Sequence, residues 1–92
     1  MIVSFKCLDT QALFTTGKSP RFANIKIVAE PKLTQLHAAL SLESLRAPPG
    51  NHFEALVGHR RGQHSIRVND QWRVCFVWTD EGVKDVEIVD YH

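Results

Sequence analysis

Residues 63–89 read QHSIRVNDQWRVCFVWTDEGVKDVEIV, and this stretch is rich in valine, isoleucine and aromatic residues. Such residues favour β-strands, whereas clusters of asparagine, aspartate and glycine favour the turns between strands. Two turn segments, Asn69-Asp70 and Asp80-Glu81-Gly82, divide the stretch into runs at 63–68, 72–78 and 83–89. With Phe53–Leu56 before them, these runs predict a group of four strands joined by short connections.

The residues before this group follow a helical pattern. Between positions 24 and 40 the apolar residues recur mostly every three or four positions, which predicts a helix. Pro31 lies inside that segment and predicts a kink or a restart, because proline removes a backbone donor. Asp9 or Thr10 is a plausible N-cap for a shorter helix, and Gly17 is suited to end it.

The order of elements predicts the fold class. A strand at Ile2–Lys6, then helices, then the four strands indicates an α+β fold with helices on one face of a mainly antiparallel sheet. The 92 residues suit one small domain, residues 1–92, and the 43% hydrophobic and 23% charged content excludes a disordered chain.

Neither targeting nor metal motifs are readable in the sequence. The uncharged apolar runs are shorter than the roughly 20 residues of a membrane helix, and no signal peptide is readable at the start. Cys7 and Cys75 are too few for a disulfide framework, and no Cys/His cluster has metal-ligand spacing. We therefore expect reduced thiols, a cytoplasmic location, and no metal, cofactor or membrane partner.

Charge is unevenly distributed although the net charge is only +1. Residues 59–73 hold four arginines and one acid, residues 18–32 hold four cations and one acid, and residues 78–92 hold five acids and one lysine. Two basic segments predict either a face that binds a polyanion or a surface on which the charges neutralise one another. Trp72 and Trp78 are expected in the core.

Arg73 is the first candidate site residue, because it interrupts an apolar run. Its guanidinium could bind a phosphate or form a structural ion pair. The loop Gly58–Gly62 could contact a nucleic-acid backbone or be a solvated run of charge. Asp90 and His92 would share one strand face, unless the chain end is frayed. Arginine, histidine, tyrosine and aspartate together suit metal-free cleavage of RNA by its own 2′-hydroxyl.

Four segments carry a resemblance to a known family. They are Pro48-Pro49-Gly50-Asn51, Gly58-x-Arg60-x-Gly62-Gln63-x-Ser65-Ile66-Arg67, Gln71-Trp72-Arg73 and Val86-Glu87-Ile88-Val89-Asp90-Tyr91-His92. They resemble HigB, the toxin of HigB/HigA toxin–antitoxin pairs in the RelE/ParE superfamily. Ile2–Phe5 and the helical segment before Leu40 fit as well, so the resemblance spans the whole chain.

The resemblance implies a RelE-like, microbial-ribonuclease-like fold with two to three helices on a curved antiparallel sheet. It implies ribosome-dependent cleavage of mRNA. It also implies a helix-turn-helix antitoxin, HigA, and operator DNA would be bound only through that antitoxin. Catalytic or substrate-contacting roles would fall on Arg73, Asp90, Tyr91 and His92, with Arg67 as an RNA contact. We expect Arg73 and His92 to converge. Candidate contacts to ribosomal RNA are Lys18, Arg21, Lys26, Arg60 and Arg61.

Two positions depart from the pattern. Some HigB toxins have a histidine and a lysine where this chain has Glu54 and Val57. Either His92 and Arg73 carry more of the reaction, or this protein is a slower nuclease. Two further hypotheses remain: a ParE-like toxin that inhibits gyrase and cleaves nothing, and a remnant that only titrates its antitoxin.

Overall fold

The computed structural model describes residues 1–90. Its sheet has four antiparallel strands in the order β1-β2-β3-β4. The strands are β1 (Glu54–Ala55), β2 (His64–Arg67), β3 (Trp72–Thr79) and β4 (Gly82–Asp90). The four strands predicted after residue 52 are all present, although β1 is shorter than expected, and both predicted turns lie between strands.

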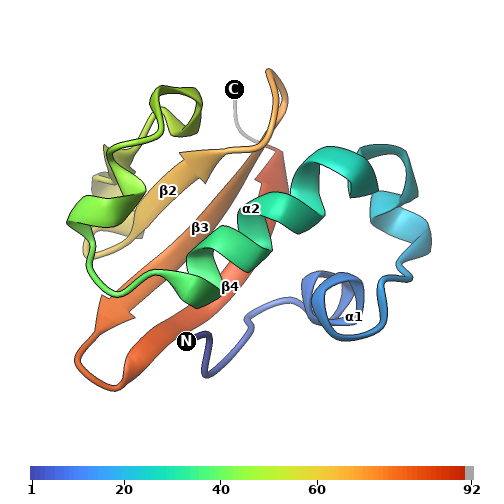
Figure 1. Ribbon diagram of the computed structural model, residues 1–92, viewed down its shortest axis with the longest axis horizontal. Coiled ribbons are helices and arrows are strands. Elements are labelled where there is room, and N and C mark those ends of the chain that lie inside the picture. The colour runs from blue at the N-terminus through green and yellow to red at the C-terminus, as the bar shows by residue number, and fades with distance from the viewer. Residues whose placement is uncertain (91–92) are drawn as a thin grey trace.

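Two α-helices, α1 (Leu8–Thr16) and α2 (Lys26–Ala38), precede the sheet. In Figure 1, α2 crosses one face of the sheet in front of β3 and β4, and α1 lies beside it near the N-terminus. Short 3₁₀ turns fill the connections: η1 (Pro20–Ile25), η2 (Glu43–Leu45), η3 (Pro49–Asn51) and η4 (Gly58–Arg60). The predicted α+β class, with helices on one face of an antiparallel sheet, is confirmed.

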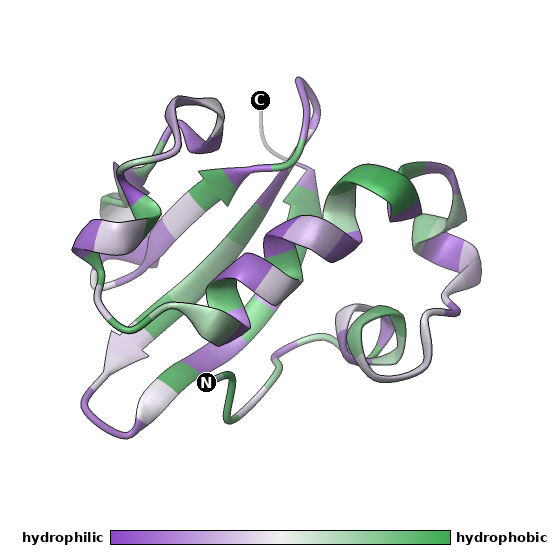
Figure 2. Ribbon diagram, viewed as in Figure 1, coloured by the Kyte–Doolittle hydropathy of each residue, from purple (hydrophilic) through white to green (hydrophobic). Residues whose placement is uncertain are grey.

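The core lies between α2 and the sheet. Ala29, Leu33 and Leu36 recur at helical spacing on α2 and are fully buried. Beneath them, the register aligns Ile66, Val74 and Ile88 across three neighbouring strands, and all three are buried. Figure 2 shows hydrophobic bands on α2 and on the strands it covers. Since each buried leucine, isoleucine or valine side chain contributes about 1.5–3 kcal/mol, this contact holds the two layers together.

Strand alternation gives the sheet two chemically different faces. Trp72, Val74 and Phe76 of β3 face the helices, so Arg73 and Cys75 face the other way. Side chains that pair directly across strands share a face. Three of the four partners of Arg73 and Cys75 are polar or charged, namely Arg67, Ser65 and Glu87, and the fourth is Val89. The face opposite the helices therefore carries the charged side chains of the sheet around Arg73.

A β-bulge in β4 changes its alternation. Cys75 pairs with Glu87 and Val77 with Lys84, so β4 has one more residue than β3 between these pairs. The extra residue is Asp85, whose φ is 53°, and its N–H donates to the hydroxyl of Ser4 at 2.9 Å. The bulge lets valines at both 83 and 86 point into the core although their spacing is odd.

Three details differ from the predictions at the N-terminal half. Residues 2–6 do not form a strand, because they make only two isolated parallel bridges, beside the bulge of β4. The helix α1 begins at Leu8 after Cys7, so Asp9 and Thr10 are not its N-cap. The Thr10 hydroxyl is instead buried and accepts a hydrogen bond from the Ile88 N–H at 3.0 Å, which satisfies an edge group of β4.

The predicted end of α1 is confirmed, since Gly17 has φ 72° and its N–H donates to the Leu13 carbonyl. Of the kink or restart predicted at Pro31, the restart is wrong, because α2 runs through Pro31 as one helix. Pro31 is on the exposed side of α2, where its ring faces solvent rather than packed side chains. No helix within residues 1–90 has the length and apolar character needed to cross a membrane.

His64 lies at the start of β2 between two aromatic rings. Its ring centroid is 5.2 Å from that of Phe53 and 6.2 Å from that of Phe76. Its Nδ1 is buried and has no hydrogen-bond partner within residues 1–90. Burial, and then the charge of Arg46, lower the pKa of His64 below its ordinary value of 6.5. The neutral ring is therefore the form that the fold favours.

Candidate functional site

Arg73 is the centre of the charged face of the sheet. Its Nε donates to the Ser65 hydroxyl at 2.7 Å, and one Nη donates to the His52 carbonyl at 2.5 Å and to the Ser65 carbonyl at 3.3 Å. The side chain is only 8% exposed. Because the guanidinium is planar and rigid, these bonds fix its plane and direction.

A carboxylate accompanies this guanidinium. Glu54 of β1 is paired with Ser65 in the sheet register, which places it on the same face. Its Oε1 lies 3.8 Å from the other Nη of Arg73, and its side chain is 47% exposed. A half-exposed carboxylate beside a held guanidinium brings a proton acceptor and a cation to one place on the surface.

A second arginine–glutamate pair lies on the same face. Arg60 donates to Glu87 Oε1 at 2.8 Å and to Gln63 Oε1 at 3.1 Å. Glu87 is the register partner of Cys75, which is fully buried. Burial is the main cause that raises the pKa of the Cys75 thiol, so this group stays protonated and is not a nucleophile.

The structure brings the predicted Arg67 next to Arg73 but gives it a partner of its own. The two residues are directly opposite in the β2–β3 register. The guanidinium of Arg67 is bonded to Asp70 in the following turn, and its side chain is about one-third exposed. Arg67 therefore lies at the edge of the site.

Asp90 is placed on the other face of the sheet. It pairs in register with Trp72, whereas Val89 pairs with Arg73. Its Oδ2 accepts a hydrogen bond from Gln71 Nε2 at 3.1 Å. The predicted roles of Tyr91 and His92, and the predicted convergence of His92 with Arg73, fall outside the described residues.

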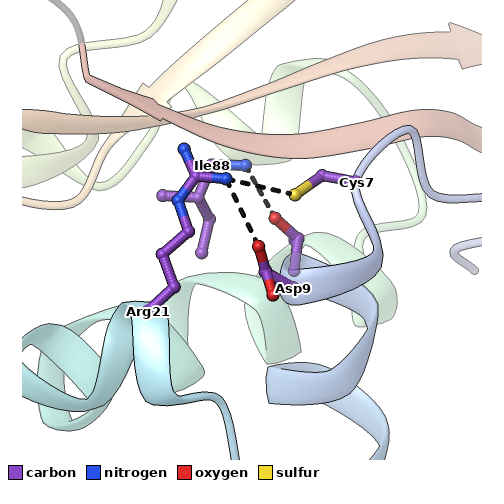
Figure 3. A network of polar contacts seen from close by, with 5 residues as sticks. Cys7, Asp9, Arg21 and Ile88 are labelled. Carbon is purple, nitrogen blue, oxygen red and sulfur yellow. Dashed lines mark hydrogen bonds and ion pairs between the residues drawn. The ribbon is translucent and has the colours of Figure 1, made fainter.

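The remaining predicted cations form two groups. Arg61 follows η4 and is exposed, near Arg60. Lys18 and Lys26 line a surface pocket of about 320 Å³ at the corner between α1, η1 and α2. Arg21 in the same corner reaches Asp9 at 3.4 Å and Cys7 Sγ at 3.9 Å (Figure 3). The basic residues thus gather on one charged sheet face and one helical corner.

Sequence reasoning missed most of the groups around Arg73. From the sequence, Glu54 was noted only as standing where some relatives have a histidine, and no role was assigned to Ser65 or to the His52 carbonyl. The period-2 pattern of β2 could have placed Ser65 on the same face as Arg67. A backbone carbonyl leaves no signal in a sequence. Within residues 1–90, no three His, Cys, Asp or Glu side chains come together as metal ligands.

Comparisons with known proteins agree with this architecture. The family model of the RelE-like toxin of type II toxin–antitoxin system HigB matches residues 11–92. The chain is 53% identical over 82 residues to Toxin HigB-1 of Vibrio cholerae serotype O1, which covers 87% of this chain and 86% of that protein. It is 33% identical over 72 residues to an uncharacterized protein of Haemophilus influenzae, covering 78% and 69% of the two chains.

A solved structure shares the fold at lower identity. The YoeB–YefM complex from Staphylococcus aureus contains a chain that matches with a TM-score of 0.58 and 18% identity, over 100% of this chain and 95% of that one. The family match and the extent of the V. cholerae relative decide the assignment. The chain belongs to the HigB-like toxins, which are RelE-like toxins of type II toxin–antitoxin systems.

Proposed function

We propose that this HigB-like toxin is a metal-independent endoribonuclease, a single domain of residues 1–92. It cleaves mRNA on the ribosome in the cytoplasm and so inhibits translation and growth. The observation that supports the proposal is the guanidinium of Arg73, which is held by Ser65 and the His52 carbonyl beside the half-exposed Glu54. A gyrase-inhibiting binder of the same fold would need no such pairing of a fixed cation with a proton acceptor.

Arg73 stabilises the charge that develops on the transferring phosphate. A cation already fixed in place loses little by reorganisation when the transition state forms, and removing such a group costs on the order of 3 kcal/mol. The phosphate approaches from the side of Glu54, whose side chain is 47% exposed.

The proton transfers use groups on either side of that phosphate. The ribose 2′-oxygen attacks phosphorus, and its proton passes to the carboxylate of Glu54. The bond from phosphorus to the 5′-oxygen breaks, and the imidazolium of His92 donates a proton to that oxygen. The products are a 2′,3′-cyclic phosphate and a 5′-hydroxyl. Tyr91 contacts the substrate, whereas Asp90, which lies on the other face of the sheet from Arg73, is given no part in this centre. In this scheme Glu54 takes the place of the histidine of some relatives.

The basic groups outside this centre bind ribosomal RNA. Arg60, Arg61 and Arg67 extend from the charged sheet face, while Lys18, Arg21 and Lys26 form the helical corner. Phosphate contacts of this kind add affinity without base specificity and weaken with salt. A HigA-like helix-turn-helix antitoxin neutralises the toxin, and operator DNA is bound only through that antitoxin. Co-purification of the product of an adjacent reading frame tests this pairing.

The test of the activity is cleavage of a defined mRNA on purified ribosomes, with the new 5′ ends mapped. Arg73→Met and Glu54→Gln are each expected to lower the cleavage rate at least about 100-fold. Glu43→Gln is the matched control, because the Glu43 carboxylate is 83% exposed and pairs only locally with Arg46 within residues 1–90. Uncut mRNA together with inhibited supercoiling by gyrase would replace this proposal with the gyrase-inhibitor hypothesis.

A further inference from the structure

The turn Pro48-Pro49-Gly50-Asn51 ends in an amide that is fully buried. Asn51 is 0% exposed, and both ends of its side chain are bonded. Its Nδ2 donates to Gln35 Oε1 at 2.7 Å and to the Leu45 carbonyl at 3.0 Å, and its Oδ1 accepts from Lys32 Nζ at 2.5 Å. Asn51 therefore fastens η3 to both α2 and η2.

The next residue adopts a backbone conformation that few side chains accept. His52 has φ 41° and ψ 53°, in the left-handed region. The side chain of His52 is exposed, so packing of the imidazole does not require this conformation. The turn instead orients the His52 carbonyl toward Arg73, and one Nη of Arg73 donates a hydrogen bond to it at 2.5 Å.

These contacts form a continuous connection from α2 to Arg73. Lys32 and Gln35 hold the amide of Asn51, Asn51 fixes the turn, and the turn presents the His52 carbonyl. We infer that Asn51 is a positioning residue for Arg73, acting through the His52 carbonyl. The inference rests on the role given to Arg73 under the proposed function. It gives the turn a role in the site, although the side chains of Pro49 and His52 are exposed.

The experiment compares Asn51→Ala with Asn24→Ala, a surface control in η1. The first readout is the Nε–H signal of Arg73 in ¹⁵N NMR, which reports its surroundings without any catalysis. The second is mRNA cleavage, separated into kcat and KM. Asn51→Ala is expected to shift or broaden the Arg73 signal and to lower kcat about 10- to 100-fold, with KM within about twofold. Asn24→Ala changes neither.

Two further variants keep the test decisive. Gln35→Ala removes one acceptor of the Asn51 amide and gives a smaller change in the same direction if Asn51→Ala does not fold. Lys32→Ala removes the donor to Asn51 Oδ1 and is expected to shift the Arg73 signal in the same direction. Normal kcat and an unshifted Arg73 signal in Asn51→Ala, or in Gln35→Ala if only that folds, would overturn the inference. Full activity of Arg73→Met would instead count against the proposed function.

Discussion

Ser65→Ala isolates one of the hydrogen bonds that hold Arg73. The hydroxyl accepts from Arg73 Nε at 2.7 Å, and both side chains are nearly inaccessible to water. The change removes one oxygen atom and leaves the backbone and the Cβ in place. A hydrogen bond to a charged group contributes about 1.5–3 kcal/mol, and water cannot replace the lost acceptor at this depth. We therefore expect the free energy of unfolding to fall by about 2 kcal/mol.

The assay is urea unfolding followed by far-UV circular dichroism, with the slope of the transition compared to show that the unfolded state is unchanged. Ser44→Ala is the matched control. Its hydroxyl also makes one short hydrogen bond, at 2.6 Å to the Ser41 carbonyl, but it is exposed. The control is expected to change stability by less than about 0.5 kcal/mol.

A double-mutant cycle with Arg73→Met decides whether the loss belongs to this pair. Removing the guanidinium removes the donor, so Ser65→Ala should then cost much less. The coupling free energy is expected to be about 1.5–2 kcal/mol. A coupling below about 0.5 kcal/mol would refute the view that the Ser65 hydroxyl holds Arg73.

Three other predictions concern stability and RNA binding. Because burial lowers the pKa of His64, the unfolded chain binds that proton more readily, so stability falls as pH drops below about 6.5, and His64→Phe should flatten this part of a stability–pH curve. A Cβ at Gly82 would lie 2.7 Å from the Met1 carbonyl oxygen at φ 138°, so Gly82→Ala should cost about 2 kcal/mol or more in urea unfolding, while Gly50→Ala, with open space around it, stays within about 0.5 kcal/mol. Arg60→Ala breaks a partly buried ion pair and should cost about 1 kcal/mol, whereas the exposed Arg61→Ala should spare stability and weaken salt-dependent ribosome binding, as measured by pelleting.

Local patterns accounted for most of the secondary structure. The three long strands and the helix across positions 26–38 follow from the spacing of apolar residues, since a period of two or of about 3.6 reports which face is buried. Gly17 ended its helix as predicted, because only a residue tolerant of positive φ suits that position. The errors lie at Ile2–Lys6, at the start of α1 and at Pro31, where distant contacts or solvent exposure outweigh local preference.

The site was predictable only in part. A charged residue inside an apolar strand must have a partner, and that argument identified Arg73 from sequence. The same reasoning could not name the partner, because hydrogen-bond acceptors for a buried side chain come from wherever the chain folds back. From sequence alone, the exposed Glu54 was interpreted only as the replacement of a histidine that some relatives have. The β1–β2 register places it beside Arg73, 19 positions later in the sequence.

The amino-acid sequence by itself determined the order of helices and strands, the antiparallel topology implied by short turns, and the presence of an arginine that needs a binding partner. Only the tertiary structure decided what surrounds that arginine. Strand register places Ser65 opposite Cys75, two positions along β3 from Arg73. The left-handed turn at His52 places a carbonyl beside Arg73 from 21 positions away in the sequence. Periodicity reports the environment of each residue along its own element, whereas a site is set by distances between elements, which depend on register, bulges and the path of loops.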